Sequence, residues 1–227
     1  MEDYELENKN IFEHALQREA SEKNLPTLNM MNRSGRAINF IEERIKYINT
    51  ASFTFLSKRW ISHLAKYMEG KRVLELMSGT GALAKCLMDE GVNIKATDNM
   101  SWHESKPECI RFNWEENMWC TVEKIDNVNA IRKYGNDVDL ILISWLPYNE
   151  DDICKDIINT IREVNPDINI VLIGEDEGGC CASDIFFENI VDITDTSENT
   201  FHLHEARRNY RSWYCIHDGI SLVKIKK

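Results

Sequence analysis

One stretch in the first half of the sequence constrains the fold of this chain more than any other. It is an apolar run that turns through two glycines and continues with helical spacing, Val73-Leu74-Glu75-Leu76-Met77-Ser78-Gly79-Thr80-Gly81-Ala82-Leu83-Ala84. A strand that ends in a glycine loop and continues as a helix is typical of α/β folds that bind nucleotides at the loop. The glycines allow the backbone to turn tightly and to approach a ligand without a Cβ in between. The stretch therefore predicts a strand–loop–helix unit of an open sheet.

Apolar runs and helical patterns alternate through the rest of the chain. We expect strands at residues 73–77, 92–97, 121–124, 139–144, 168–173 and 220–225, and helices at 82–90, 127–134, 151–164 and 183–189. The Asp218-Gly219 pair stands between two alternating runs, 213–216 and 220–225, which favours a hairpin. The expected fold class is therefore α/β: a mostly parallel, seven-stranded Rossmann-like sheet with helices on both faces and a C-terminal antiparallel hairpin.

The segment before the first strand has a different pattern. Residues 1–69 show helical spacing without a strand signal, and Gly70 stands where a helix would end. We expect three helices here, the second over about 38–48 and the third over about 53–67. The segment is assigned as a helical N-terminal extension that closes over the site as a lid, and residues 70–227 as the ligand-binding domain.

Composition excludes several classes of protein. The formal net charge of −11 over 227 residues argues against a duplex nucleic-acid partner, because phosphate contacts need clustered Lys and Arg. No apolar run approaches the roughly 20 residues of a membrane helix, and the polar, acidic N-terminus resembles no signal peptide. The seven cysteines form no C-x-x-C pair, so we expect no metal site and no disulfide framework. These features predict a cytoplasmic protein with reduced thiols.

The residues around the glycine loop narrow the choice of ligand. The spacing Gly79-x-Gly81 with Asp98 nineteen residues after Gly79 fits a dinucleotide site equally well. Glu75 decides against it, because a carboxylate at the end of the strand would repel a pyrophosphate. An opposite charge at 4 Å would gain about 4 kcal/mol at an effective dielectric of 20. A nucleoside that carries an ammonium and a sulfonium fits, which points to S-adenosylmethionine.

With these residues the sequence resembles the class I S-adenosylmethionine-dependent methyltransferases. Their first motif is an acidic residue followed by x-G-x-G-x-G, and here Met77 stands where the first glycine usually stands. The resemblance covers about residues 50–227. It implies that the cofactor S-adenosylmethionine is bound by Glu75, Met77, Ser78, Gly79, Thr80 and Gly81, with Asp98 on the ribose, Asn99 near the adenine, and Asp126 and Asn127 at the adenine amino group.

A second candidate element follows the strand at 139–144. Ser144-Trp145-Leu146-Pro147-Tyr148 resembles the (Asp/Asn/Ser)-Pro-Pro-(Tyr/Phe) element of amino-methyltransferases, although Trp145 occupies the first position and an indole can only donate. Ligands bind beyond the carboxyl ends of strands in open α/β sheets, so we expect Ser144 beside the cofactor. Trp145 and Tyr148 are the candidate catalytic residues, through stacking or cation–π contacts with the acceptor. The alternative is that this segment only packs the strand end.

Several clusters of charged or reactive residues allow more than one interpretation of their role. Acidic residues after two strands, at 150–152 and 175–177, would steer a cationic substrate or form solvated turns. Cys180-Cys181 has no histidine placed beside it by the sequence, which makes a catalytic thiol less expected. His202 and His204, at strand spacing, suggest proton transfer or a metal, or polar surface. Arg207, Arg208 and Arg211 would hold an anionic group of the substrate or offset the acidic surface.

Together these patterns predict an S-adenosylmethionine-dependent methyltransferase that N-methylates a small molecule or a protein side chain, with a cationic acceptor. Methyl transfer needs alignment and exclusion of water more than acid–base groups, so the helices before the first strand are expected to cover the cofactor and help to define the substrate pocket. Two alternatives stay open: an inactive member of the fold that binds partners, and an aminopropyl transferase, which also uses acidic residues against a polyamine.

Overall fold

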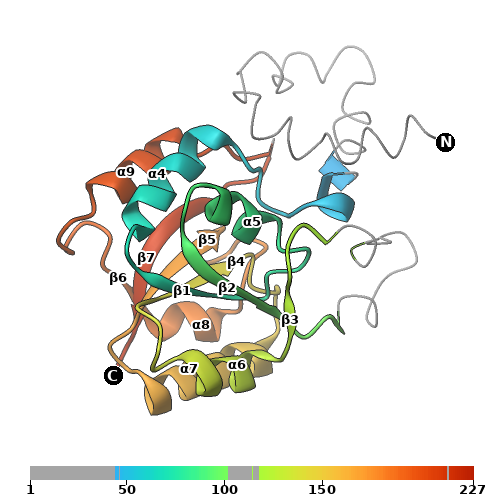
Figure 1. Cartoon of the computed structure of the whole chain (residues 1–227). Helices are drawn as coiled ribbons and strands as arrows, with labels where there is room; N and C mark the ends of the chain where they lie inside the picture. The colour runs from blue at the N-terminus through green and yellow to red at the C-terminus, as the bar shows by residue number, and fades with distance from the viewer. Residues whose placement is uncertain (1–43, 46, 102–113, 115–117, 214) are drawn as a thin grey trace.

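The computed structural model describes residues 44, 45, 47–101, 114, 118–213 and 215–227, and its core is one sheet of seven strands (Figure 1). The strand order is β3-β2-β1-β4-β5-β7-β6. The strands are β1 Arg72–Leu76, β2 Asn93–Asp98, β3 Glu123–Lys124, β4 Leu140–Ser144, β5 Asn169–Gly174, β6 Ile190–Asp192 and β7 Gly219–Ile225. Strands β1 to β5 run parallel, and β7 is antiparallel to both β5 and β6.

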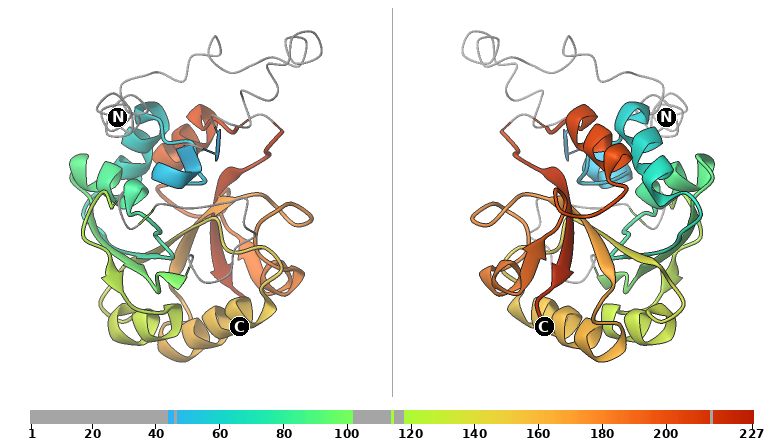
Figure 2. Two further views of the ribbon diagram at one scale, coloured as in Figure 1. Left: turned by 90° about the vertical axis from the view of Figure 1, so that its right-hand side faces the viewer. Right: turned by 90° about the vertical axis from the view of Figure 1, so that its left-hand side faces the viewer.

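Helices cover both faces of this sheet. They are α4 Lys58–Met68, α5 Ala82–Asp89, α6 Asn127–Tyr134, α7 Asp151–Val164, α8 Asp184–Glu188 and α9 Phe201–Asn209. Figures 1 and 2 show α4, α5 and α9 on one face and α6, α7 and α8 on the other. A parallel sheet needs this double cover because its connections place helices on both faces.

Two apolar clusters form the core, one on each face of the sheet. Along β4, Leu140 and Leu142 pack with α4 and α5, while Ile141 and Ile143 pack with α6 and α7. All four side chains are at most 1% exposed. Successive side chains of a strand point to opposite faces, so a central strand between two helix layers is apolar at every position. The predicted reading of 139–144 as a strand buried on both faces is confirmed.

The fold class is confirmed, and most predicted ranges differ from the observed ones by one or two residues. The predicted helix at 151–164 coincides with α7. The described residues between 44 and 50 are helical, whereas the helix expected over 53–67 begins only at Lys58. The first expected helix and most of the second fall on residues 1–43 and 46, which lie outside the described residues.

The C-terminal third departs most from the prediction. The antiparallel edge is present, but its second strand is β6, which the sequence did not indicate, and the described residues of 213–216 form no strand. Gly219 has no positive φ, so Asp218-Gly219 is not the tight hairpin turn that was expected. His202 and His204, expected at strand spacing, belong to helix α9, whose buried residues Leu203 and Ala206 follow helical spacing.

Within the described residues, no helix combines the length and apolar character that crossing a membrane requires.

Candidate cofactor and acceptor site

The loop after β1 has an unusual backbone that explains its one departure from the glycine pattern. Met77, Gly79 and Gly81 have φ values of 55°, 55° and 74°. Met77, where the first glycine of the motif usually stands, therefore adopts the left-handed conformation that glycine would take without strain. For an L-residue this conformation costs about 1–2 kcal/mol. The loop keeps the glycine-type path although one glycine is missing.

The two remaining glycines are needed because other groups approach them closely. A Cβ on Gly79 would lie 2.8 Å from Cζ3 of Trp114, and one on Gly81 would lie 2.6 Å from Sγ of Cys120. Both distances are shorter than van der Waals contact, and both residues also have a positive φ. The backbone around the loop thus leaves room for neighbouring groups that any other residue would displace.

Asp98, at the end of β2, clamps this loop to the sheet. Its carboxylate accepts hydrogen bonds from the backbone N–H of Gly79 at 2.8 Å and of Met100 at 2.6 Å. Ser78 adds a backbone bond of 3.0 Å and a hydroxyl bond of 3.2 Å, both donated to the carbonyl of Thr97. The Thr80 hydroxyl donates to the carbonyl of Ala51 at 2.5 Å, which ties the loop to the segment before α4. The predicted residues 78–81 and Asp98 therefore form one connected unit.

Glu75 is a buried carboxylate in the middle of this unit. It is 1% exposed, and its Oε2 has no hydrogen-bond partner among the described residues. Burial, and then the charge of Asp98, raise the pKa of Glu75 well above its usual value. A buried carboxylate without a partner is unfavourable unless a cation joins it. This residue fits a ligand that carries a positive charge, as S-adenosylmethionine does.

A small cavity opens beside Glu75 and joins the glycine loop to the end of β4. Residues from four parts of the chain line it: Ala51, Ser52, Phe53, Glu75, Met77, Ser78, Gly79, Leu83, Trp114, Ser144 and Trp145. Part of its wall is aromatic: Phe53 stacks on Trp145 at a centroid distance of 5.6 Å and meets Trp114 edge-on at 6.1 Å. A carboxylate and aromatic faces around one space suit a cationic, partly apolar ligand.

Backbone strain concentrates at this edge of the sheet. Among the described residues other than glycine, seven have a positive φ, and five of them follow strands at the carboxyl edge: Met77, Met100, Trp145, Asn149 and Ala182. The loops after β4 and β5 are joined by backbone bonds of 2.9 Å, from Asn149 to Ala182 and from Ala182 to Leu146. Strained conformations persist where surrounding contacts enforce them, and they cluster at functional sites.

The residues predicted around the acceptor differ in whether they line the cavity. Trp145 lines the cavity, and Ser144 lines it while its hydroxyl lies 2.8 Å from the Thr54 hydroxyl. Tyr148 is 63% exposed and is not among the lining residues that the structure describes. Trp145 is therefore placed to form a wall of the cavity, and Tyr148 lies outside it on the surface.

The predicted adenine and ribose residues lie at the same edge but outside the cavity lining given above. Asp126 caps α6 and accepts a bond of 2.9 Å from the backbone N–H of Asn129. Asn127 is the first residue of α6, and the Asn99 side chain accepts from the backbone N–H of Ser101 at 2.9 Å. These contacts are local: they shape the turn after β2 and the start of α6.

The acidic residues at the rim divide into an exposed and a buried group. Those at 150–152, together with Asp176 and Glu177, are exposed. Glu175 is buried and accepts bonds from the backbone N–H of His217 at 2.8 Å and of Cys180 at 2.7 Å. Burial raises its pKa, but these N–H groups outweigh that effect and lower it overall. Glu175 therefore organises the loops, while the others lie exposed at the rim, where Asp152 is 3.8 Å from Lys155 on the same helix.

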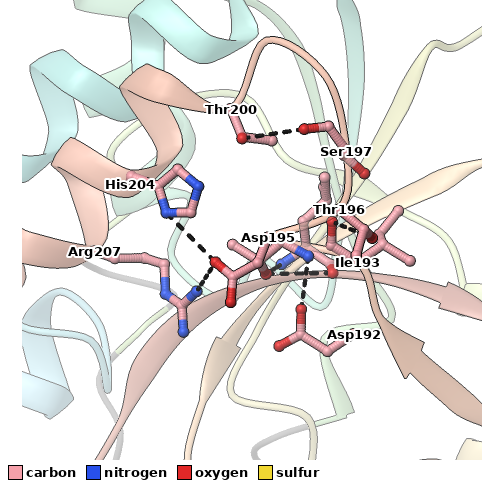
Figure 3. Close-up of polar contacts among 10 residues, drawn as sticks. Asp192, Ile193, Asp195, Thr196, Ser197, Thr200, His204 and Arg207 are labelled. Atoms are coloured by element: carbon pink, nitrogen blue, oxygen red, sulfur yellow. Dashed lines mark hydrogen bonds and ion pairs between the residues drawn. The ribbon is translucent and has the colours of Figure 1, made fainter.

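The histidine and arginine clusters take part in surface contacts of α9 (Figure 3). Asp195, in the loop between β6 and α9, lies 3.8 Å from His204 and 4.0 Å from Arg207. Arg208 lies 3.8 Å from Glu205 on the same helix. In the part of the chain that the structure describes, no three or more metal-ligating side chains gather. The contacts of His204 and Arg207 thus join α9 to its preceding loop, while that of Arg208 stays within the helix.

A polar group that the sequence did not single out lies behind Trp145. Tyr210 donates a hydrogen bond of 2.5 Å to Oδ2 of Asp218, and both side chains are buried. Thr54, which reaches Ser144, is fully buried as well. Thr54 is far in sequence from Ser144, Tyr210 and Asp218, and these residues carry no local motif, so only the folded arrangement brings them together.

The match to a known protein family agrees with the cofactor that this geometry favours. A family model described as lysine methyltransferase matches residues 41–192. The chain belongs to the lysine methyltransferase family. It is an enzyme that uses S-adenosylmethionine as its cofactor, as the glycine loop and Glu75 had indicated. No curated protein matches the sequence significantly.

The chain is also similar to solved structures, at low sequence identity. A mutant MtNAS in complex with S-adenosylmethionine is 12% identical, with a TM-score of 0.43 over 85% of this chain and 74% of that one. The mitomycin 7-O-methyltransferase MmcR is 11% identical, with a TM-score of 0.40 over 96% and 67%. A putative methyltransferase, yhhF, from Escherichia coli is 11% identical, with a TM-score of 0.41 over 74% and 87%. Likenesses of this size say nothing about the methyl acceptor.

Proposed function

We propose that this methyltransferase transfers the methyl group to the ε-amino nitrogen of a lysine side chain in a protein substrate. The observation that carries the proposal is the cavity that joins the unpaired carboxylate of Glu75 to the aromatic wall of Trp145. One end suits the cationic cofactor and the other suits a side chain with an amine. The description of the family as lysine methyltransferase supports the acceptor class.

In this proposal the cofactor half is the unit formed by Glu75, the glycine loop and Asp98. When bound, S-adenosylmethionine supplies an electrophilic methyl group. Glu75 would hold positive charge, and the positive φ values of Gly79 and Gly81 would shape the loop that meets the cofactor. Asp98 would hold the ribose, with Asn99, Asp126 and Asn127 near the adenine. Asp98 would also keep the loop in place through its backbone hydrogen bonds.

The acceptor half is the wall of Trp145 and Ser144 together with the exposed edge around Tyr148. An indole face attracts an ammonium through its quadrupole, and it excludes water from the space in which the nitrogen must approach. Tyr148, 63% exposed, and the exposed acidic residues at 150–152 would meet a basic segment of the substrate first. Positioning and desolvation supply most of the acceleration that methyl transfer needs.

Residues 1–69 are proposed as the cover of this site. Their described part already reaches the site, because the carbonyls of Ile48 and Thr50 accept bonds of 2.7 Å from the indoles of Trp114 and Trp119. Ala51, Ser52 and Phe53 line the cavity directly. Deletion of residues 1–35 is expected to weaken cofactor binding and turnover. Unchanged values of both would contradict the role of a lid.

The test is transfer of a radioactive methyl group from S-adenosylmethionine to an array of lysine-containing peptides by the full-length protein. A matched array carries arginine at each lysine. We expect label on the lysine array alone, and its loss with Trp145→Ala. Label on small amines only, or on neither array, would contradict the proposal. Turnover of the decarboxylated cofactor with a polyamine would instead identify an aminopropyl transferase.

A further inference from the structure

A row of buried hydroxyl groups leads from the cavity to a buried carboxylate. Ser144 lines the cavity, and its hydroxyl lies 2.8 Å from the Thr54 hydroxyl. Thr54 also interacts with the phenol of Tyr210, which in turn bonds to Asp218 at 2.5 Å. Thr54, Tyr210 and Asp218 are 0%, 8% and 6% exposed, so water has little access to the row.

The direction of these hydrogen bonds is fixed at the buried end. A carboxylate only accepts, so the Tyr210 hydroxyl donates to Asp218, and its oxygen faces the nearby Thr54 hydroxyl, which lowers the pKa of the phenol. Burial and the charge of Asp218 raise the pKa of Tyr210, while the Thr54 hydroxyl opposes this, as a donor to the phenol oxygen would. Thr54 then accepts from Ser144, and the Ser144 oxygen is left to accept from a group in the cavity.

Asp218 has the surroundings of a group that exchanges a proton. Burial raises its pKa above the usual value, against hydrogen bonds from Tyr210, Ser212 and Trp145. Its Oδ1 and the indole nitrogen of Trp145 both lack a well-aligned partner in the described part of the chain. Burial raises the pKa of the Cys181 thiol and the charge of Asp218 adds to this, while the charges of Asp218 and Glu175 oppose the burial that lowers the pKa of Arg44. Asp218 therefore acts electrostatically on both a thiol and a guanidinium.

A role in stability alone explains less of the arrangement of Thr54, Tyr210 and Asp218. A buried carboxylate with an unpaired oxygen is unfavourable, and apolar residues of similar volume would fill the space at no such loss. Tyr47 shows what a structural tyrosine looks like in the same protein. It is 5% exposed, and its phenol oxygen accepts a bond of 3.0 Å from the backbone N–H of Leu56.

We propose that Ser144, Thr54 and Tyr210 relay to Asp218 the proton that a lysine ammonium must lose before it can accept the methyl group. This inference rests on the proposed lysine acceptor. A lysine amine has a pKa of about 10.4, so near neutral pH its nitrogen lone pair is occupied by a proton. The ammonium gives that proton to Ser144, and each hydroxyl passes its own proton to the next group until Asp218 is protonated.

The transfer step then balances without a further reactant. The freed lone pair forms a bond to the methyl carbon, the bond from that carbon to sulfur breaks, and sulfur keeps the electron pair. The products are a methylated ammonium, S-adenosylhomocysteine and one proton on Asp218. Asp218 and Tyr210 act through Ser144 and are therefore positioning residues of the reaction.

The experiment compares Thr54→Val with Thr54→Ser across a pH series, using the lysine peptide array and full-length protein. The valine variant breaks the row in its middle while it nearly keeps the side-chain volume, and the serine variant keeps a hydroxyl. We expect Thr54→Val to lose at least tenfold in kcat at pH 7 and Thr54→Ser to recover most of it. Without a relay, the rate follows the neutral amine in solution, which rises about tenfold per pH unit below its pKa. The deficit of the valine variant is therefore expected to shrink as the pH rises towards 10.

The controls separate a relay from a loss of packing. Tyr210→Phe is expected to show the same shrinking deficit, whereas Tyr47→Phe is expected to show none, and thermal unfolding reports the stability of each variant. If Thr54→Val does not fold, Tyr210→Phe makes the same comparison. A deficit that is constant across pH, or equal in Thr54→Ser, would overturn the relay while the lysine acceptor stands. A wild type that labels no lysine peptide would overturn both.

Discussion

The two halves of the site are built in different ways. The cofactor half is nearly continuous in sequence: it consists of residues 75–81 and Asp98, which hydrogen bonds join into one unit. The acceptor half, with Ser144, Trp145 and Tyr148 after β4, is backed by Thr54 from before α4 and by Tyr210 and Asp218 from the C-terminal part of the chain. The sequence of a local motif is limited by the backbone conformation that the motif must adopt. A site whose residues come from separate segments can change one residue at a time. Within a shared fold, we expect the cofactor to be constant and the acceptor to vary.

The largest expected effect of a single change lies in the cofactor half. Gly81→Ala would place a Cβ 2.6 Å from the Cys120 sulfur at a φ of 74°. We expect a loss of about 2–4 kcal/mol in the free energy of unfolding, measured by denaturant titration. Gly91→Ala is the matched control, because φ is 91° there and nothing lies within 4 Å of the added atom. Equal losses in both variants would show that strain alone, and no close approach, requires Gly81.

Glu75→Gln is expected to stabilise the protein without cofactor by about 1–2 kcal/mol at pH 8, because it removes a buried, unpaired charge. Burial and Asp98 raise the pKa of Glu75, so the folded state binds a proton there more tightly than the unfolded chain. The stability from this group is fully present below the unfolded pKa of about 4.3 and is lost as the pH rises through the folded pKa. The gain in the variant should therefore vanish near pH 4 and grow with pH.

Thermal unfolding of both proteins across this pH range tests the sign. Glu90→Gln, at an exposed position, is the control and should show no such trend. A variant that is less stable than the wild type at pH 8 would mean that Glu75 has a partner within the protein.

Met77→Gly is expected to raise the free energy of unfolding by up to about 1 kcal/mol. Glycine takes the φ of 55° without strain. Two effects oppose this gain: glycine loses more entropy on folding, and the contacts of the methionine side chain with the core on the side of α6 and α7 are lost. Chemical denaturation measures the change. Met88→Gly, in the last turn of α5, should lower the free energy of unfolding by about 0.5–1 kcal/mol, because glycine loses more conformational freedom on folding. A destabilised Met77→Gly would show that packing of this side chain outweighs the strain.

The smallest change in stability is expected in the acceptor half, with Tyr148→Ala. An exposed side chain outside the cavity contributes less than about 0.5 kcal/mol. The KM for the acceptor peptide should rise about fivefold to tenfold while the Kd for the cofactor stays unchanged. Phe201→Ala, 69% exposed on α9, should change neither. A weaker cofactor affinity in Tyr148→Ala would mean that the two halves are not separate.

The same contrast explains what the sequence allowed us to predict. The first four residues of β4 are apolar because both faces of the strand are covered, and the motif at 75–81 depends on neighbours in sequence, so both could be recognised. The region after β5 depends on distant contacts. β6 has only three residues, and α9 shows just Leu203 and Ala206 to the core, which is too little for a periodic pattern. Asp218 precedes a glycine as in a turn, yet its hydrogen bond to Tyr210 shows a different role.

Calorimetric titration of the wild type and Glu75→Gln with S-adenosylmethionine and with NAD tests the central claim most directly, namely that the buried carboxylate of Glu75 selects a cationic cofactor. We predict that the wild type binds S-adenosylmethionine and does not bind NAD, and that Glu75→Gln weakens the binding at least tenfold although the variant is more stable. Equal affinity of the two proteins for S-adenosylmethionine, or binding of NAD by the wild type, would contradict the account.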